Sequence, residues 1–258
     1  MKLLGVTWDK SVLVSFDPYT GAIVEKHAWL NPNESFRGLA YNSKKNVLFA
    51  LSQIDCNLYS IDPLTRNVAL IGRLNINGND IGGLTYDPAN DILYTAVNHF
   101  DADYTNISSD LVKVDMDTAV VTVIGKIADG LCGSLSWRDY DGKINAFVKY
   151  GSGSSDSSHK ANVVSISPNT AAMTTVFETP YHTIMGLAKK PGENSYFSWV
   201  NWTSHFYGEV NLDTKNIATL ASSDGVGVSS DAMIIRSFYI APAPNLPPCS
   251  FSNVDCMG

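Results

Sequence analysis

Short apolar runs alternate with clusters of turn residues along the whole chain. After Arg37, four such runs follow one another: GLAY, NVLFALS, NLYSID and NVALIGRL. Runs of this length, bounded by Asn, Asp, Pro and Gly, are typical of β-strands. No segment of useful length shows the periodicity of an amphipathic helix. The pattern predicts an all-β chain.

A turn motif recurs five times along the sequence. Its copies are SFDPYTGAIV (15–24), SIDPLTRNVA (60–69), KVDMDTAVVT (113–122), SISPNTAAMT (165–174) and EVNLDTKNIA (209–218). In each copy a small polar residue stands three positions before a threonine, as Asp62 stands before Thr65. Asp, Asn or Ser at such a position accepts hydrogen bonds from backbone N–H groups further along the turn, and a following Pro presets φ. We interpret these residues as scaffold and assign them no catalytic role.

A Gly-Leu-like element precedes an apolar strand upstream of each copy after the first. These segments are RGLAYNSKKNVLFALS (37–52), GGLTYDPANDILYTAV (82–97), GSLSWRDYDGKINAFV (133–148), MGLAKKPGENSYFSWV (185–200) and VGVSSDAMIIRSFYIA (226–241). The repeat period is about 45 to 53 residues, and four short strands at such a period are the signature of a β-propeller blade. Five turns predict five blades, and a sixth blade lacks its turn.

The two ends of the chain are expected to close the ring. The sequence starts on the second strand of a blade, KLLGVTW, and finishes on a first strand. A blade built from both termini removes the exposed edges of the sheets. Two segments are candidates for the closing strand, Val228–Ile234 and Ser237–Ile240, and the sequence leaves the choice open. We expect a propeller over residues 1–242 and a tail over 243–258 that packs on it.

In the form of its repeats, the whole chain resembles bacterial and fungal five-bladed β-propeller proteins built from GLAYDP…LYAIDPTG units. The resemblance matches no specific functional family. It therefore implies the fold and not the function.

Charge and hydropathy exclude several classes of partner. The formal net charge of −7 argues against nucleic acid and acidic membrane surfaces, and the chain has no run of Lys or Arg. No apolar stretch approaches the roughly 20 residues that span a bilayer. A small-molecule ligand or substrate is the expected partner, and the sequence does not indicate the oligomeric state.

Several features favour a secreted protein whose leader has been removed, with a cytoplasmic protein as the alternative. The four cysteines are an even number, and Asn33, Asn106 and Asn201 begin sequons for N-glycosylation. A disulfide between Cys249 and Cys256 would tie down the Pro-rich tail.

Propeller connectivity separates the loops into two faces. The repeated turns and the turns between the first and second strand of each blade lie on one face, here called the bottom face. The remaining loops lie on the other, here called the top face. The top loops differ between blades whereas the scaffold repeats, which predicts one composite site at the top of the central channel.

The candidate site residues fall in the top loops or at the strand ends beside them. The candidates for catalysis are His182, Arg37, Tyr181 and His99. The candidates for substrate binding are Trp8, Phe36, Asp80, Ile81, Cys132, Ile184, Met185, Trp202 and His205. This mixture of apolar, aromatic and few polar groups is usual in a small-molecule pocket. Phe36, Ile81, Cys132 and Ile184 have an alternative role as core residues that plug the channel, and Arg37 has an alternative partner in Glu34.

No metal-binding or cofactor-binding motif stands out, so we expect neither a metal site nor a cofactor. These residues favour an enzyme that acts on a mostly apolar organic substrate by cyclisation, cycloaddition or isomerisation. It would work by positioning and by hydrogen-bond polarisation of a carbonyl. One alternative is a secreted carbohydrate-binding or adhesion propeller with shallow Trp-lined grooves. The other is a metal-dependent polysaccharide lyase, whose metal would be held by two or more of His99, His182 and His205 with Asp80 or Asp101.

Overall fold

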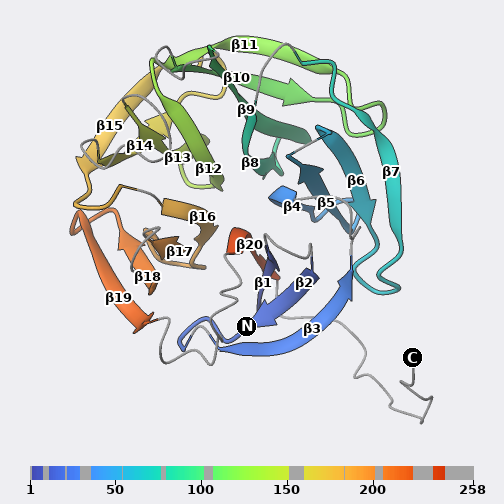
Figure 1. Cartoon of the computed structure of the whole chain (residues 1–258), viewed down its shortest axis with the longest axis horizontal. Coiled ribbons are helices and arrows are strands. Elements are labelled where there is room, and N and C mark those ends of the chain that lie inside the picture. The colour runs from blue at the N-terminus through green and yellow to red at the C-terminus, as the bar shows by residue number, and fades with distance from the viewer. Residues whose placement is uncertain are drawn as a thin grey trace.

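Five antiparallel sheets of four strands each form a ring, and the described part of the chain contains no helix (Figure 1). The computed structural model describes residues 2–7, 12–20, 22–29, 36–53, 55–76, 80–101, 107–150, 160–182, 184–200, 206–222 and 235–241. The sheets follow one another round the ring in chain order, as the blades of a propeller do (Figure 1). The predicted all-β, five-bladed β-propeller is confirmed.

Within each blade the four strands run from the channel outward. Blade 2 holds β4 (Phe36–Asn42), β5 (Val47–Ser52), β6 (Asn57–Ile61) and β7 (Val68–Arg73). Blade 3 holds β8 (Asp80–Asp87), β9 (Ile92–Phe100), β10 (Ile107–Val114) and β11 (Val121–Ala128). Blade 4 holds β12 (Leu131–Arg138), β13 (Lys143–Lys149), β14 (Ala161–Ile166) and β15 (Met173–Glu178). Blade 5 holds β16 (Ile184–Lys189), β17 (Ser195–Val200), β18 (Phe206–Asn211) and β19 (Asn216–Ser222).

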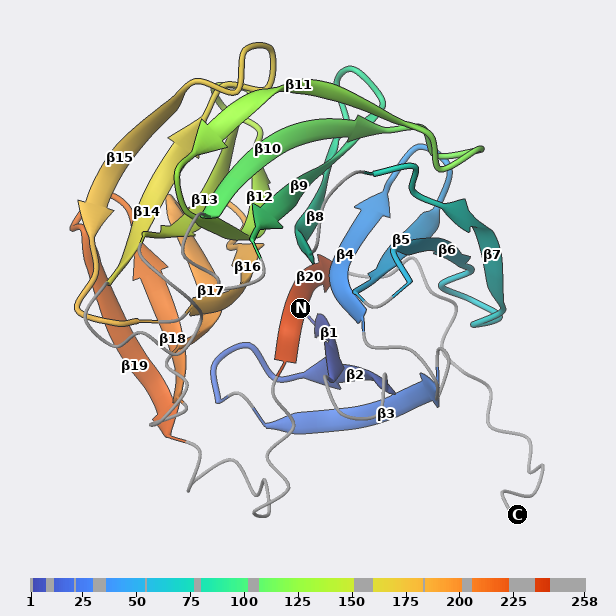
Figure 2. The same ribbon diagram turned by 45° about the horizontal axis from the view of Figure 1, so that its top comes forward.

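Blade 1 is built from both ends of the chain. Its inner strand is β20 (Ile235–Ala241), followed by β1 (Lys2–Thr7), β2 (Val12–Phe16) and β3 (Ile23–Trp29). Leu3 lies opposite Ile240 and Gly5 opposite Phe238 in the antiparallel ladder, and Figure 2 shows β20 beside β1. The closing strand therefore includes the Ser237–Ile240 candidate. The other candidate, residues 228–234, and the tail at 243–258 lie outside the described residues.

In the described residues, four of the five repeated turns have the predicted side-chain hydrogen bonds, and the turn at Ser167 shows backbone bonds in their place. Asp62 Oδ1 accepts from the N–H groups of Leu64, at 2.7 Å, and Thr65, at 3.1 Å. Asp17, Asp115 and Asn211 accept the same pair of bonds in their own turns. The bonds from Thr65 and Leu64 lower the pKa of Asp62, because they stabilise its charged form. These turns are scaffold on the bottom face.

The Gly-Leu element allows the inner strands of neighbouring blades to approach closely. A Cβ on Gly38 would lie 2.6 Å from Leu84 Cβ, and one on Gly82 would lie 2.8 Å from the carbonyl oxygens of Cys132 and Gly133. The ladders of β4, β8, β12 and β16 with their second strands all change register at this point. The narrow ring of five blades brings these backbones together, so a side chain has no room at Gly38 or Gly82.

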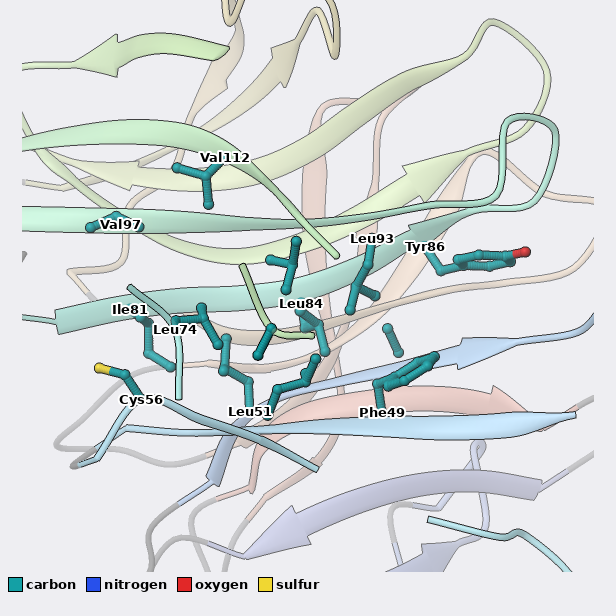
Figure 3. Close-up of a cluster of buried hydrophobic side chains, with 14 residues drawn as sticks. Phe49, Leu51, Cys56, Leu74, Ile81, Leu84, Tyr86, Leu93, Val97 and Val112 are labelled. Atoms are coloured by element: carbon teal, nitrogen blue, oxygen red, sulfur yellow. The ribbon is translucent and has the colours of Figure 1, made fainter. Parts of the chain in front are cut away.

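The apolar core is divided among the junctions between blades. Figure 3 shows one such cluster, in which Phe49 and Leu51 of blade 2 face Leu84 and Leu93 of blade 3. The second strand of each of blades 2 to 5 is almost wholly buried, because neighbouring blades cover both its faces. Burial of this kind supplies most of the favourable free energy of folding.

Three predictions about processing and location remain untested. The sequon residues Asn33, Asn106 and Asn201, and the cysteines Cys249 and Cys256, lie outside the described residues. Cys56 and Cys132 are free and buried. Among the described residues, the structure has no helix with the length and apolar character needed to cross a bilayer.

Candidate functional site

The predicted apolar wall of the site lies in the cores between blades. Phe36, Ile81, Cys132 and Ile184 occupy matching positions at the top ends of β4, β8, β12 and β16, and all four are buried. Each belongs to the cluster between its own blade and the preceding one. The structure gives these residues a packing role, and their contact with a substrate stays a prediction.

Cys132 is expected to resist alkylation in the folded protein. Burial raises the pKa of its thiol to about 12, because the thiolate would be desolvated. Iodoacetamide at pH about 8 should therefore leave Cys132 unmodified until denaturant is added, as measured by peptide mass spectrometry. Rapid labelling of Cys132 in the native protein would contradict its burial.

The position that follows each of these four wall residues holds three different residue types in the four blades. The positions hold Arg37 in β4, Gly82 in β8, Gly133 in β12 and Met185 in β16. Met185 packs against the apolar cluster that joins blades 5 and 1. Arg37 is thus the one charged side chain among these four positions. The asymmetry of the top face, predicted from the loops, extends to the described ends of the inner strands.

Arg37 joins blade 2 to blade 3 at the top of the channel. Its guanidinium Nη1 forms an ion pair with Asp80 Oδ2 and donates to the carbonyl oxygen of Ile81 at 3.1 Å. The Arg37 side chain is 23% exposed and that of Asp80 only 8%, so a ligand from solvent meets Arg37 first. The alternative partner of Arg37, Glu34, lies outside the described residues.

One carboxylate oxygen of Asp80 is unpaired within the part of the chain that the structure describes. Oδ1 is buried and has no hydrogen-bond partner among the residues that the structure describes. A buried acceptor without a partner costs about 1–3 kcal/mol. Such an atom is therefore a natural point of attachment for a donor on a ligand.

His99 forms a second polar pair in blade 3. Its Nε2 lies 2.9 Å from Asp110 Oδ2, and both side chains are about one-third exposed. The preceding residue, Asn98, lies opposite Asp80 in the ladder of β8 and β9. A carboxylate that bonds one nitrogen of a histidine orients the imidazole ring. The pairing with Asp110 therefore fixes the His99 imidazole on the strand next to β8, and a catalytic role for His99 stays a prediction.

Asn98 is a positioning residue that sequence reasoning missed. Its fully buried amide donates from Nδ2 to the carbonyl oxygen of Cys132 at 3.1 Å, and its Oδ1 accepts from the Cys132 N–H at 3.0 Å. These two bonds fix blade 3 to blade 4 beside the channel. The available signal was an amide at the end of the apolar run LYTAV.

Tyr181 and His182 lie elsewhere on the ring, at the entry to blade 5. The Tyr181 ring packs edge-on against Phe206, with centroids 5.2 Å apart, and its carbonyl oxygen accepts from the Ala161 N–H at 2.8 Å. His182 follows and is half-buried. The candidates for catalysis therefore divide into Arg37 and His99 at blades 2 and 3, and Tyr181 and His182 at blade 5. Trp8, Trp202 and His205 lie outside the described residues.

The metal-dependent alternative gains no support from the part of the chain that the structure describes. Within that part, no three His, Cys, Asp or Glu side chains gather as ligands for a metal ion. His205, one of the predicted ligands, is not among the described residues.

Comparison with known proteins supports the fold. No protein-family model matches the sequence, and no curated protein matches it either. Among solved structures, a chain of a nidogen–laminin complex has a TM-score of 0.57 at 9% identity, with 92% of this chain and 97% of that one covered. TolB from Acinetobacter baumannii has a TM-score of 0.51 at 14% identity, with 88% of this chain and 51% of that one covered. The chain is a β-propeller.

A third likeness is to hydrazine synthase from Kuenenia stuttgartiensis, with a TM-score of 0.50 at 12% identity and coverage of 84% of this chain and 64% of that one. This propeller thus spans only about half of TolB and less than two thirds of the hydrazine synthase chain. At such identities the likenesses show the fold alone. Enzymes and binding proteins both use it, so function must come from the site.

Proposed function

We propose that the protein is an enzyme that binds a small, mostly apolar organic molecule at the top of the channel. Asp80 and Arg37 form its reactive pair. The observation that supports this most is the buried Asp80 oxygen without a partner, next to the guanidinium of Arg37. A structural ion pair gains nothing from an unused buried acceptor, whereas a site that receives a donor or a proton requires one.

The two side chains suit proton transfer next to a carbonyl group. Asp80 Oδ1 would take a proton from the carbon beside the carbonyl, and the Arg37 N–H groups would stabilise the negative charge that develops on the carbonyl oxygen. Return of the proton to a different carbon gives an isomer. Attack of the carbanion on a second carbonyl group in the same molecule gives a ring, and Asp80 returns its proton to the oxyanion that this attack creates. Both outcomes leave the protein unchanged and need no external electron donor or acceptor.

The surroundings would supply the positioning that such chemistry needs. The ends of β8 and β12 lie against each other without intervening side chains at Gly82. Asn98 holds β9 to β12 through two hydrogen bonds. A rigid frame of this kind keeps a bound molecule at a fixed angle to Asp80, which contributes to catalysis by removing rotational freedom in advance.

Substitution of Asp80 by Asn is expected to reduce turnover by about a hundredfold, the lower end of the usual contribution of a positioned base. The assay follows β,γ-unsaturated cyclic ketones by the ultraviolet absorbance of their conjugated isomers and by deuterium uptake from D2O. Arg37→Lys keeps the positive charge but loses the planar set of guanidinium N–H donors. It should therefore lower turnover and leave folding intact.

The matched control is Asp62→Asn, the same chemical change in a bottom-face turn. Asn211 already performs the Asp62 role in blade 5, where it accepts from the N–H groups of Asp213 and Thr214. Asp62→Asn should therefore keep both stability and turnover. The proposal would be contradicted if Asp62→Asn and Asp80→Asn lost turnover equally. It would also be contradicted if the wild-type protein isomerised none of the ketones.

A further inference from the structure

A pocket opens on the bottom face, where the sequence analysis placed only scaffold. Its volume is about 880 Å3, and it lies between the turns of blades 3 and 4. Trp137 of β12 and Tyr94 of β9 line it, together with Asn90, Asp139, Gly142 and Asn169. This volume falls within the usual range for small-molecule sites. The pocket is on the opposite face from Asp80, so a ligand bound there is independent of the proposed function.

The pocket exists because blade 4 departs from the repeat at two positions. In blade 2 the Tyr41 hydroxyl donates to Asn46 Oδ1 at 2.6 Å, and in blade 3 the Tyr86 hydroxyl donates to Asp91 Oδ1 at 2.7 Å. Each bond closes the corner between the first two strands. The equivalent positions in blade 4 hold Trp137 and Gly142, so the closing hydrogen bond is replaced by open space.

Gly142 has the backbone conformation of its two counterparts. Its φ is +64°, against +51° for Asn46 and +57° for Asp91. The turn therefore has the same shape in all three blades, and only the side chain has been lost. A Cβ on Gly142 would lie 3.9 Å from Trp137 Cζ2. A longer side chain at this position would occupy the space beside the edge of the indole ring.

Trp137 is held rigidly as a platform. Its ring stacks on Tyr94 at a centroid distance of 6.2 Å and an interplanar angle of 4°, and Tyr94 itself is buried. The backbone N–H of Trp137 donates to Thr85 Oγ1 of blade 3 at 2.7 Å. The half-buried indole thus presents a fixed apolar surface to the pocket at little cost in conformational entropy.

Polar groups surround this platform. Asn90 Nδ2 donates to Asp87 Oδ2 at 2.7 Å, which fixes the amide at the pocket and leaves its oxygen as an acceptor. The Asn169 amide and the Asp139 carboxylate are on exposed turns, and in the described ranges neither has a hydrogen-bond partner. A ligand finds one flat apolar face and a rim that both donates and accepts hydrogen bonds.

We propose that this pocket binds a pyranose sugar. A pyranose ring has one face of C–H groups, which fits the indole, and equatorial hydroxyls that donate and accept around its edge, which fit the amides and the carboxylate. An apolar ligand would leave the rim unpaired. Among the residues that line the pocket, Asp139 supplies the one carboxylate that a cationic ligand would find.

The test is titration of the full chain with methyl glycosides of glucose, mannose and galactose and with N-acetylglucosamine, followed by saturation-transfer NMR and calorimetry. At least one glycoside should bind to the wild-type protein. Gly142→Asn, which restores the residue of blade 2, should weaken its binding at least about tenfold without loss of stability. Trp137→Ala should abolish binding.

The control is Asn46→Gly, the converse change in blade 2, where Tyr41 remains and no Trp platform is present. It should leave sugar binding unchanged. The proposal is overturned if no glycoside binds, if Gly142→Asn binds as tightly as the wild type, or if choline binds at this pocket more tightly than every glycoside. Gly142→Asn retains Trp137, so its result is interpretable even where Trp137→Ala fails to fold.

Discussion

A chain shortened to end at residue 234 is expected to lose cooperative unfolding altogether. β20 pairs with β1 along its whole length, from Lys2 opposite Ala241 to Thr7 opposite Ile235, and it also contacts β16 and β4 of the two neighbouring blades. It is therefore the element that joins blade 5 to blade 2. Without it, β1 becomes an exposed edge and two junctions between blades lose one wall.

Thermal unfolding followed by circular dichroism is the measurement, with differential calorimetry as a check on cooperativity. The control is a chain that ends at residue 241, which retains β20 and removes only the following segment. It should keep a single sharp transition. A cooperative transition of normal midpoint in the chain ending at 234 would show that the ring does not depend on β20.

Gly82→Ala is expected to destabilise the fold by about 3 kcal/mol, at the upper end of the range for overpacking. The new Cβ would lie 2.8 Å from the carbonyl oxygens of Cys132 and Gly133 and 3.0 Å from Ala96 Cβ. Two of these atoms are backbone, so relief requires that blades 3 and 4 separate. For a domain of this size the melting temperature should fall by about 10 °C.

Gly133→Ala is the matched control, because Gly133 occupies the same position one blade further along. Its nearest neighbours, the carbonyl oxygens of Ile184 and Phe147, would be 3.8 Å from the new Cβ, an ordinary contact distance. The substitution should shift the melting temperature by less than about a quarter as much as Gly82→Ala. Equal shifts for the two variants would contradict the close approach of β8 to β12.

The repeated turns could be predicted from the sequence because each is stabilised by interactions among its own neighbouring residues. A turn such as that at Asp62 needs only its own residues, so its hydrogen bonds could be inferred from the sequence and are present in the structure. Counting these turns gave the number of blades. Closure of the ring followed from the incomplete blade at each end, although the choice of closing strand required the ladder between β1 and β20.

The partners of the site residues were less accessible to sequence reasoning. Arg37 had Glu34 as a nearby candidate in the sequence, whereas in the structure it pairs with Asp80, a full repeat away. Likewise the hydrogen bonds between Asn98 and the Cys132 backbone depend on how blade 3 packs against blade 4. Contacts between blades depend on the twist and spacing of whole sheets, which no local pattern encodes.

The bottom pocket shows a different limitation. The sequence contained both departures, Trp137 in place of Tyr and Gly142 in place of Asn or Asp. These departures indicate a pocket only once the hydrogen bonds of the Tyr41 and Tyr86 hydroxyls are known, and only the structure shows those bonds. Every site residue is predicted on the top face, so these two bottom-face positions are not among them. A departure from a repeat is informative once the interaction that it removes is known.

We propose that the repeated turns are scaffold and that Asp80, at the top of the channel, takes a proton from the substrate. The most direct test is the ratio of deuterium exchange rates into a cyclic ketone for Asp80→Asn and Asp62→Asn, measured on preparations with matched unfolding curves. We predict that Asp62→Asn exchanges at the wild-type rate and that Asp80→Asn is slower by about a hundredfold. Equal rates for the two variants would show that the Asp80 carboxylate takes no part in the chemistry.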